Sequence, residues 1–309
     1  MRTVRVLPLA LLLLPACAAG QAPAAGAAVP AHPRADTVSL RRTLDSLADA
    51  HHGVVGYTVH NIDTGERLER RGDEPFPTAS LIKVPILVTT FALVDSGRLS
   101  LDDRIHVLKA DKVPGSGVLQ FFHDGIDITV GDAAWFMITV SDNTATNLLL
   151  DKVGIRTVWA TMERLGLPRS KVHSKSFLRS TSVAMDSSVK YGLGVTTPNE
   201  MARLFELLAR GEAVSPAADS AMLEILEHNE DYQMLYRHAG GVRAARKTGA
   251  TDSVRTECGL FHLSGRVVAC VLTKENADTR WVLDNEPQVT MARMGEAIVR
   301  AWAVPEAAR

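Results

Sequence analysis

Three short groups of polar residues occur in order along this chain of 309 residues, and together they carry the side chains needed for attack on a carbonyl carbon. They are Ser80-Leu81-Ile82-Lys83, Ser141-Asp142-Asn143 and Lys247-Thr248-Gly249. A serine hydroxyl is a weak nucleophile until a base takes its proton, and a lysine amine becomes such a base when its pKa is lowered. The residue types therefore indicate nucleophilic catalysis by a serine, with lysine as its base.

Ser80 stands where a helix is predicted to begin. The turn-like residues 75–79 precede it, and a helical pattern runs over 80–94. Residues three apart share a helix face, so Lys83 is expected to reach Ser80 Oγ. Burial, with Lys247 nearby as a second cation, would lower the pKa of Lys83. A helix N-terminus also directs the Ser80 backbone N–H toward a developing oxyanion.

The ordered set resembles the signature of class A β-lactamases and penicillin-binding proteins, where the three motifs fall at a helix start, in a loop between helices and on a strand. Taken singly, Ser80 would be read as a helix cap, Ser141 and Asn143 as loop polar groups, and Lys247 as a surface lysine. Their order and context favour the functional interpretation. The likeness runs from about Leu40 to Pro305 and is greatest to the family's divergent branch of serine hydrolases.

The resemblance implies a role for each polar residue around the nucleophile. Ser80 is acylated, Lys83 is its base, and Ser141 relays a proton to the leaving nitrogen. The other expected substrate contacts come from Asn143 (side-chain amide), Lys247 and Thr248 (carboxylate), Gly249 (close backbone approach) and the backbone N–H of Ala250 (second oxyanion donor). Asp142 is expected to brace its own loop.

The loop carboxylate of the family is missing. Class A enzymes carry Glu-x-x-Leu-Asn on the loop after the Ser-Asp-Asn helix, and that glutamate activates the water that hydrolyses the acyl-enzyme. The corresponding stretch, 167–197, holds no glutamate, and its single carboxylate is Asp186. Asp186 is therefore the candidate for deacylation, against the alternative that it is a turn or cap residue.

Three functions stay open, and all of them use the same nucleophile. The first is a class A-like β-lactamase that hydrolyses the β-lactam amide. The alternatives are a peptidoglycan enzyme similar to D-alanyl-D-alanine carboxypeptidases, and a penicillin-binding protein or sensor that deacylates slowly. Turnover of the acyl-enzyme separates the three.

Hydrophobic periodicity places strands at both ends of the chain and helices between them. Helices are predicted over 36–50, 80–94, 129–140, 145–153 and 287–304, and strands over 54–61, 67–70, 256–262 and 266–273, with a second β region beginning over 241–249. We expect an α/β (α+β), β-lactamase-like fold, in which an antiparallel sheet with flanking helices carries an inserted all-helical domain. The α/β domain comprises 36–97 and 235–309 and the helical domain 98–234, with the site in the groove between them.

The first residues have the features of an export signal. Arg2 and Arg5 precede the apolar run Val6–Leu14, which is too short to span a membrane. We expect a signal peptide over 1–16, a tether rich in Ala, Pro and Gly over 17–35, and a periplasmic protein. The lipobox-like Leu14-Pro15-Ala16-Cys17 predicts a lipid anchor on Cys17, and ordinary cleavage near Ala16, Ala18 or Ala19 is the alternative.

Composition and cysteine usage restrict the partners. The net charge is −1 and charge runs are short, so no nucleic acid is expected to bind. No Cys/His cluster has zinc spacing, and we expect no metal or other cofactor. Cys258 and Cys270 lie on two predicted neighbouring strands, where a disulfide and two buried thiols both fit. The expected partner is a small β-lactam or D-alanyl peptide, bound by a monomer.

Overall fold

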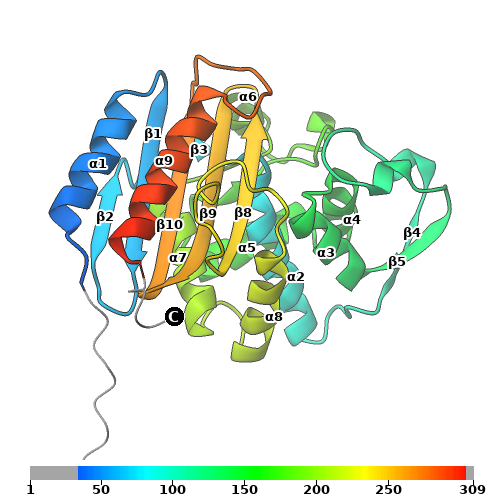
Figure 1. The fold of residues 1–309 in the computed structure, drawn as a ribbon. Coiled ribbons are helices and arrows are strands. Elements are labelled where there is room, and N and C mark those ends of the chain that lie inside the picture. The colour runs from blue at the N-terminus through cyan, green and yellow to red at the C-terminus, as the bar shows by residue number, and fades with distance from the viewer. Residues whose placement is uncertain (1–33, 304–309) are drawn as a thin grey trace, which may run out of the picture. The chain divides into compact units, whose positions relative to one another are not determined.

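A five-stranded antiparallel sheet in the order β2-β1-β10-β9-β8 forms the centre of the computed structural model, which describes residues 34–303 (Figure 1). The predicted signal peptide, Cys17 and nearly all of the predicted tether lie outside these residues. The strands come from both ends of the chain, which confirms the predicted sheet: β1 (Val54–Asn61), β2 (Arg67–Arg70), β8 (Ala244–Thr251), β9 (Val254–Leu263) and β10 (Gly265–Lys274).

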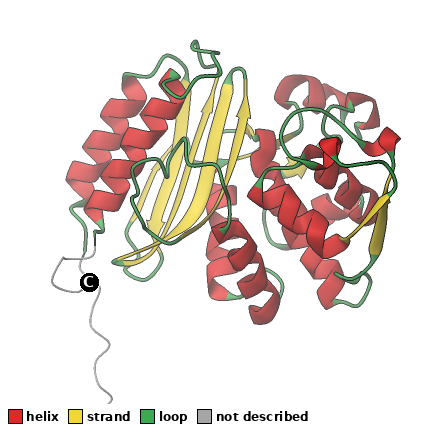
Figure 2. Cartoon of the chain, turned by 45° about the vertical axis from the view of Figure 1, so that its right-hand side comes forward, coloured by secondary structure: helices red, strands yellow, loops and turns green. Residues whose placement is uncertain are grey.

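Both faces of the sheet are covered by helices. Helices α1 (Thr37–Asp49) and α9 (Glu286–Ala301) lie side by side on one face, and α7 (Pro198–Arg210) packs against β1, β9 and β10 (Figure 2). Strand β10 is apolar almost throughout for this reason, since alternate side chains point to opposite faces. Val267, Ala269 and Val271 belong to the core cluster under α1 and α9, whereas Val268, Cys270 and Leu272 belong to the cluster on the other face.

The middle of the chain is mainly helical, as predicted. Its helices, with the one that follows Ser80, are α2 (Lys83–Asp95), α3 (Val130–Thr139), α4 (Asn143–Val153), α5 (Ile155–Arg164), α6 (Met185–Tyr191) and α8 (Pro216–Glu227). The sequence analysis missed five short strands in this region and just before it: β3 (Phe76–Pro77), β4 (Arg104–Val107), β5 (Ile126–Thr129), β6 (Lys171–Val172) and β7 (Gly194–Thr196). The proposed boundary between two domains stays a prediction.

A disulfide joins Cys258 and Cys270, which the sequence left open. The two residues face each other across β9 and β10 and are both buried. Residues 34–303 contain no helix long and apolar enough to cross a membrane. The same part of the chain contains no group of three or more His, Cys, Asp or Glu side chains arranged to hold a metal ion.

Candidate active site

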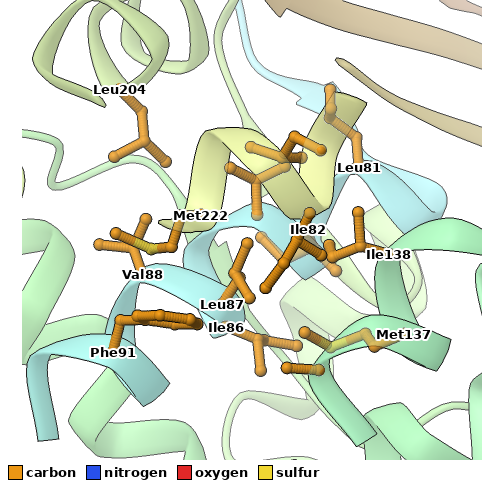
Figure 3. Close-up of a cluster of buried hydrophobic side chains, with 14 of the residues drawn as sticks. Leu81, Ile82, Ile86, Leu87, Val88, Phe91, Met137, Ile138, Leu204 and Met222 are labelled. Atoms are coloured by element: carbon orange, nitrogen blue, oxygen red, sulfur yellow. The ribbon is translucent and has the colours of Figure 1, made fainter. Parts of the chain in front are cut away.

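Ser80 lies in a short 3₁₀ turn, η1 (Ala79–Ile82), and α2 begins only at Lys83. The α-helix therefore begins about one turn later than the sequence predicted. Ala79 has a φ of 46°. This conformation is unfavourable for any residue other than glycine, and such residues cluster at functional sites. Leu81 and Ile82 are fully buried and anchor the turn, because both belong to the hydrophobic cluster of which Figure 3 shows a part.

Strand β8 passes very close to this turn, and Gly249 makes the approach possible. A Cβ atom on Gly249 would lie 2.5 Å from the Thr78 carbonyl oxygen and 2.8 Å from the Leu81 nitrogen. Thr256 Oγ1 on the neighbouring strand donates to the same Thr78 oxygen at 2.9 Å. The sequence analysis assigned Gly249 to the approach of substrate backbone, but the space beside its Cα is occupied by the chain itself.

Lys83 is fully buried, and its ammonium group has three hydrogen-bond acceptors. Nζ lies 2.6 Å from the Ser141 carbonyl oxygen, 3.1 Å from Ser141 Oγ and 3.0 Å from Asn143 Oδ1. An ammonium has the three N–H donors that these contacts require, whereas the neutral amine has two donors and a lone pair that can accept a proton. Among the described residues no hydrogen bond joins Lys83 to Ser80, which differs from the predicted direct contact.

Ser141 links the two buried lysines. Lys247 Nζ donates to Ser141 Oγ at 3.1 Å and to the Thr248 carbonyl oxygen at 2.7 Å. Ser141 itself has a φ of 54°, the second such backbone outlier next to the site after Ala79. The loop between α3 and α4 and the edge strand β8 thus meet at one hydroxyl.

Burial sets the charge of both lysines. Burial lowers the pKa of Lys83 well below its usual value, and the positive charge of Lys247 lowers it further. Burial also lowers the pKa of Lys247 to about 8, with the neighbouring Arg246 acting in the same direction. Two cations in one buried site disfavour each other's charge, so both effects favour release of a proton by Lys83, which is what a general base requires.

Asp142 braces the loop, as predicted. Its carboxylate accepts hydrogen bonds from the backbone N–H groups of Val118, Leu119 and Ala145, and so ties α4 to η3 (Leu119–Phe121). Asn143 donates to the Pro114 carbonyl oxygen at 3.1 Å, in addition to accepting from Lys83. These two hydrogen bonds fix the orientation of the Asn143 side chain.

A pocket of about 990 Å³ opens in front of Ser80. Of the predicted site residues, Ser80, Asn143 and Ala250 line it. Lys83 and Lys247 are fully buried and reach Ser141 from behind the lining. The pocket wall thus presents the nucleophile, while the groups that would move its proton are shielded from solvent.

The segment that follows β6, which includes α6, supplies one wall of the pocket, and the polar groups that it presents are hydroxyls and cations. Its polar lining residues are Ser174, Lys175, Ser176, Arg179 and Ser188. The hydroxyls of Ser176 and Ser188 are buried and have no hydrogen-bond partner in the described part of the chain. Of all the lining residues, the one carboxylate is Asp252, which comes from the turn after β8.

The structure does not bring Asp186 to this pocket. Asp186 lies in the first turn of α6, is exposed and is absent from the lining. A base must lie within hydrogen-bond reach of the water it activates. The geometry therefore favours a structural role, although Asp186 is an acidic residue in the first helical turn and not the cap, which is Ala184.

Sequence reasoning missed two aromatic residues on the pocket. Phe177 and Trp281 both line it and are 65% and 64% exposed. Neither belongs to a motif, and a single exposed aromatic gives no signal in a sequence without its neighbours in space. Only the folded chain shows that both side chains line the same pocket.

The comparisons with known proteins agree on one family. A family model described as "Beta-lactamase enzyme family" matches residues 39–302. The beta-lactamase AER-1 of Aeromonas hydrophila is 28% identical over 218 residues, which are 70% of this chain and 70% of that protein. A beta-lactamase of Rhodobacter capsulatus is 29% identical over 191 residues, 62% of this chain and 63% of the other.

Solved structures match more of the chain. A beta-lactamase from Sphaerobacter thermophilus is 31% identical with a TM-score of 0.76, over 86% of this chain and 97% of that one. The protein PBP-A is 26% identical with a TM-score of 0.74, over 87% of this chain and 98% of its own. A mutant of PBP-A with the same identity and TM-score was solved as an acyl-enzyme complex with penicillin G.

Proposed function

The chain belongs to the beta-lactamase enzyme family, and from this membership we propose that it is a class A-like serine hydrolase whose Ser80 opens the amide of a β-lactam and forms an acyl-enzyme. The observation that carries the proposal is the hydroxyl of Ser141, which accepts from Lys83 and from Lys247 at 3.1 Å each. A nucleophile needs a base and a leaving group needs an acid, and this shared hydroxyl connects the groups able to do both.

Acylation follows from the residues around the pocket. Neutral Lys83 takes the proton of Ser80 as Oγ attacks the carbonyl carbon, and the backbone N–H groups of Ser80 and Ala250 stabilise the oxyanion. The C–N bond then breaks, and the nitrogen receives a proton through Ser141. Lys83 and Ser80 must come into contact in this step, and catalytic hydrogen bonds commonly tighten only when substrate is bound.

Lys247 and Thr248 are buried next to the pocket-lining residue Ala250, and they are the proposed contacts for the substrate carboxylate. The Lys247 ammonium is held by Ser141 and the Thr248 carbonyl oxygen, so it is fixed in position before substrate arrives. A fixed cation in a site of low dielectric attracts an anion more strongly than the same charge in water. Asn143, which lines the pocket, binds the amide of the acyl side chain.

A second candidate, a penicillin-binding protein that deacylates slowly, is favoured by the composition of the loop wall. The residues of 174–193 that line the pocket include hydroxyls, Lys175 and Arg179 but no carboxylate. Without a positioned base, hydrolysis of the ester loses a factor of about 10² to 10⁴. A related peptidoglycan carboxypeptidase would share the acylation steps and take a D-alanyl peptide.

Stopped-flow mixing with a chromogenic cephalosporin tests the proposed function. The proposal expects colour to appear with the wild-type protein and none to appear with Ser80→Ala. A linear release that Ser80→Ala does not change would contradict the assignment of the nucleophile. Absence of any reaction with β-lactams in the wild type would reject the substrate class.

Export and lipid attachment are proposals that rest on the first residues of the sequence. We place the mature chain in the periplasm, anchored by lipid on Cys17, because a short apolar run ends at that cysteine. Expression with an inhibitor of the lipoprotein signal peptidase should accumulate precursor. Unchanged processing would favour ordinary secretion.

A further inference from the structure

Trp281 is an exposed aromatic ring held in a fixed orientation at the mouth of the pocket. Its indole Nε1 donates to Asp252 Oδ1 at 2.7 Å. The guanidinium of Arg255 lies 4.7 Å from the ring centroid and covers one part of it. The ring nevertheless stays 64% exposed and lines the pocket that contains Ser80.

Arg255 anchors the segment that carries Trp281 to the sheet. The arginine is fully buried and donates to the carbonyl oxygens of Thr251, Val254 and Arg280, the residue before Trp281. Gln288 Oε1 accepts a further bond from Arg255 Nε at 3.2 Å. The indole is therefore positioned in advance, and little side-chain entropy remains to be lost when a ligand packs on it.

Phe177 stands on the other wall of the pocket under similar constraint. Its φ of 59° is an outlier for a bulky residue, and its side chain is 65% exposed. Asn147 holds the turn before it by donating to the Ser176 carbonyl oxygen at 3.0 Å and accepting from the Ser176 nitrogen at 2.8 Å. Strain of this kind persists only where the surrounding structure imposes it.

The two rings lie next to the residues that would hold the acyl part of a substrate. A Cβ atom on Gly115 would meet the Phe177 ring at 2.9 Å and Asn143 Nδ2 at 2.8 Å, so Phe177 flanks Asn143. Trp281 is bonded to Asp252, two residues beyond Ala250 and its oxyanion donor. Ala250, Asp252 and Trp281 all line the pocket that contains Ser80.

We propose that Phe177 and Trp281 form an aromatic subsite that selects substrates whose acyl side chain ends in an aromatic or other flat apolar group. The inference rests on the proposed function, since it names the part of the substrate that this site prefers. Both rings line the same pocket as the nucleophile, and a ligand that covers them there removes apolar surface from water. Aromatic pairing and apolar burial there raise the rate of acylation with substrates that carry such a group.

The test compares two penicillins that differ only in one phenyl ring: benzylpenicillin and the penicillin with an acetyl side chain. The measured quantity is the ratio of their second-order rate constants for acylation, followed by mass spectrometry on the whole protein. We expect Trp281→Ala and Phe177→Ala each to lower this ratio by roughly tenfold. Trp281→Phe should keep most of the ratio because a ring remains.

Phe121→Ala is the matched control, since Phe121 is an aromatic residue that is 79% exposed and does not line the pocket. It should leave the ratio unchanged. If the ratio stays at the wild-type value in both pocket variants, the aromatic subsite is wrong, even if both rate constants fall together. Acylation of Ser80 would not be affected by that result. Absence of acylation by both penicillins in the wild type rejects the proposed function and this inference with it.

Discussion

Lys83 Nζ lies 2.6 Å from the carbonyl oxygen of Ser141, so the proposed base is bonded to the loop opposite and not to the nucleophile in its own turn. Ser141 has a positive φ of 54° at this contact. The position of the base therefore depends on two segments that are 58 residues apart in sequence.

Lys83→Ala should slow acylation by about 10² to 10⁴-fold, because the hydroxyl of Ser80 loses its base. The rate of labelling with a fluorescent penicillin measures the effect. Lys152→Ala is the control, since Lys152 is exposed on α4, and it should label at the wild-type rate. Labelling of Lys83→Ala at the wild-type rate would show that another base acts.

The rate of acylation should fall as the pH rises through about 8. Lys247 has a pKa of about 8, so it is cationic below that pH and loses its attraction for the substrate carboxylate above it. On the acid side, protonation of Lys83 removes the base. Lys247→Arg should move the basic limb upward, because arginine keeps its charge; a limb that stays near pH 8 in this variant would assign it to another group.

Gly249→Ala should destabilise the protein by about 1 to 3 kcal/mol and slow acylation, because the added Cβ would press on the backbone of η1 around Ser80. Gly131→Ala is the control, since its added Cβ meets its nearest atom at 3.4 Å. Chemical denaturation measures the free energy of unfolding of both. Equal stability of the two variants would contradict the close approach of β8.

Much of the site was predictable because each motif can be recognised from the few residues around it. The pattern over 54–61 predicted β1 to the residue, and the helix pattern after Ser80 placed the nucleophile at the start of a helical segment. The strands β3, β6 and β7 have two or three residues, too few for a period to appear. The close approach at Gly249 and the position of Phe177 and Trp281 on one pocket depend on how distant segments come together, which periodicity does not contain.

Deacylation should be slow compared with a typical class A enzyme. Mixing with a chromogenic cephalosporin should release a burst of about one equivalent, followed by a slower phase, because the loop wall offers no base to the water. Asp186→Asn should change neither phase, since Asp186 is exposed outside the pocket lining. Loss of the slow phase in that variant, with the burst kept, would instead assign Asp186 as the base.

The central claim is that Ser80 forms an ester with the opened β-lactam, and peptide mapping by mass spectrometry after treatment with penicillin tests it most directly. The account predicts one adduct with the mass of the intact penicillin on the peptide that contains Ser80, and none in Ser80→Ala. An adduct on any other residue, or no adduct at any time of sampling together with no opening of the β-lactam, would contradict it.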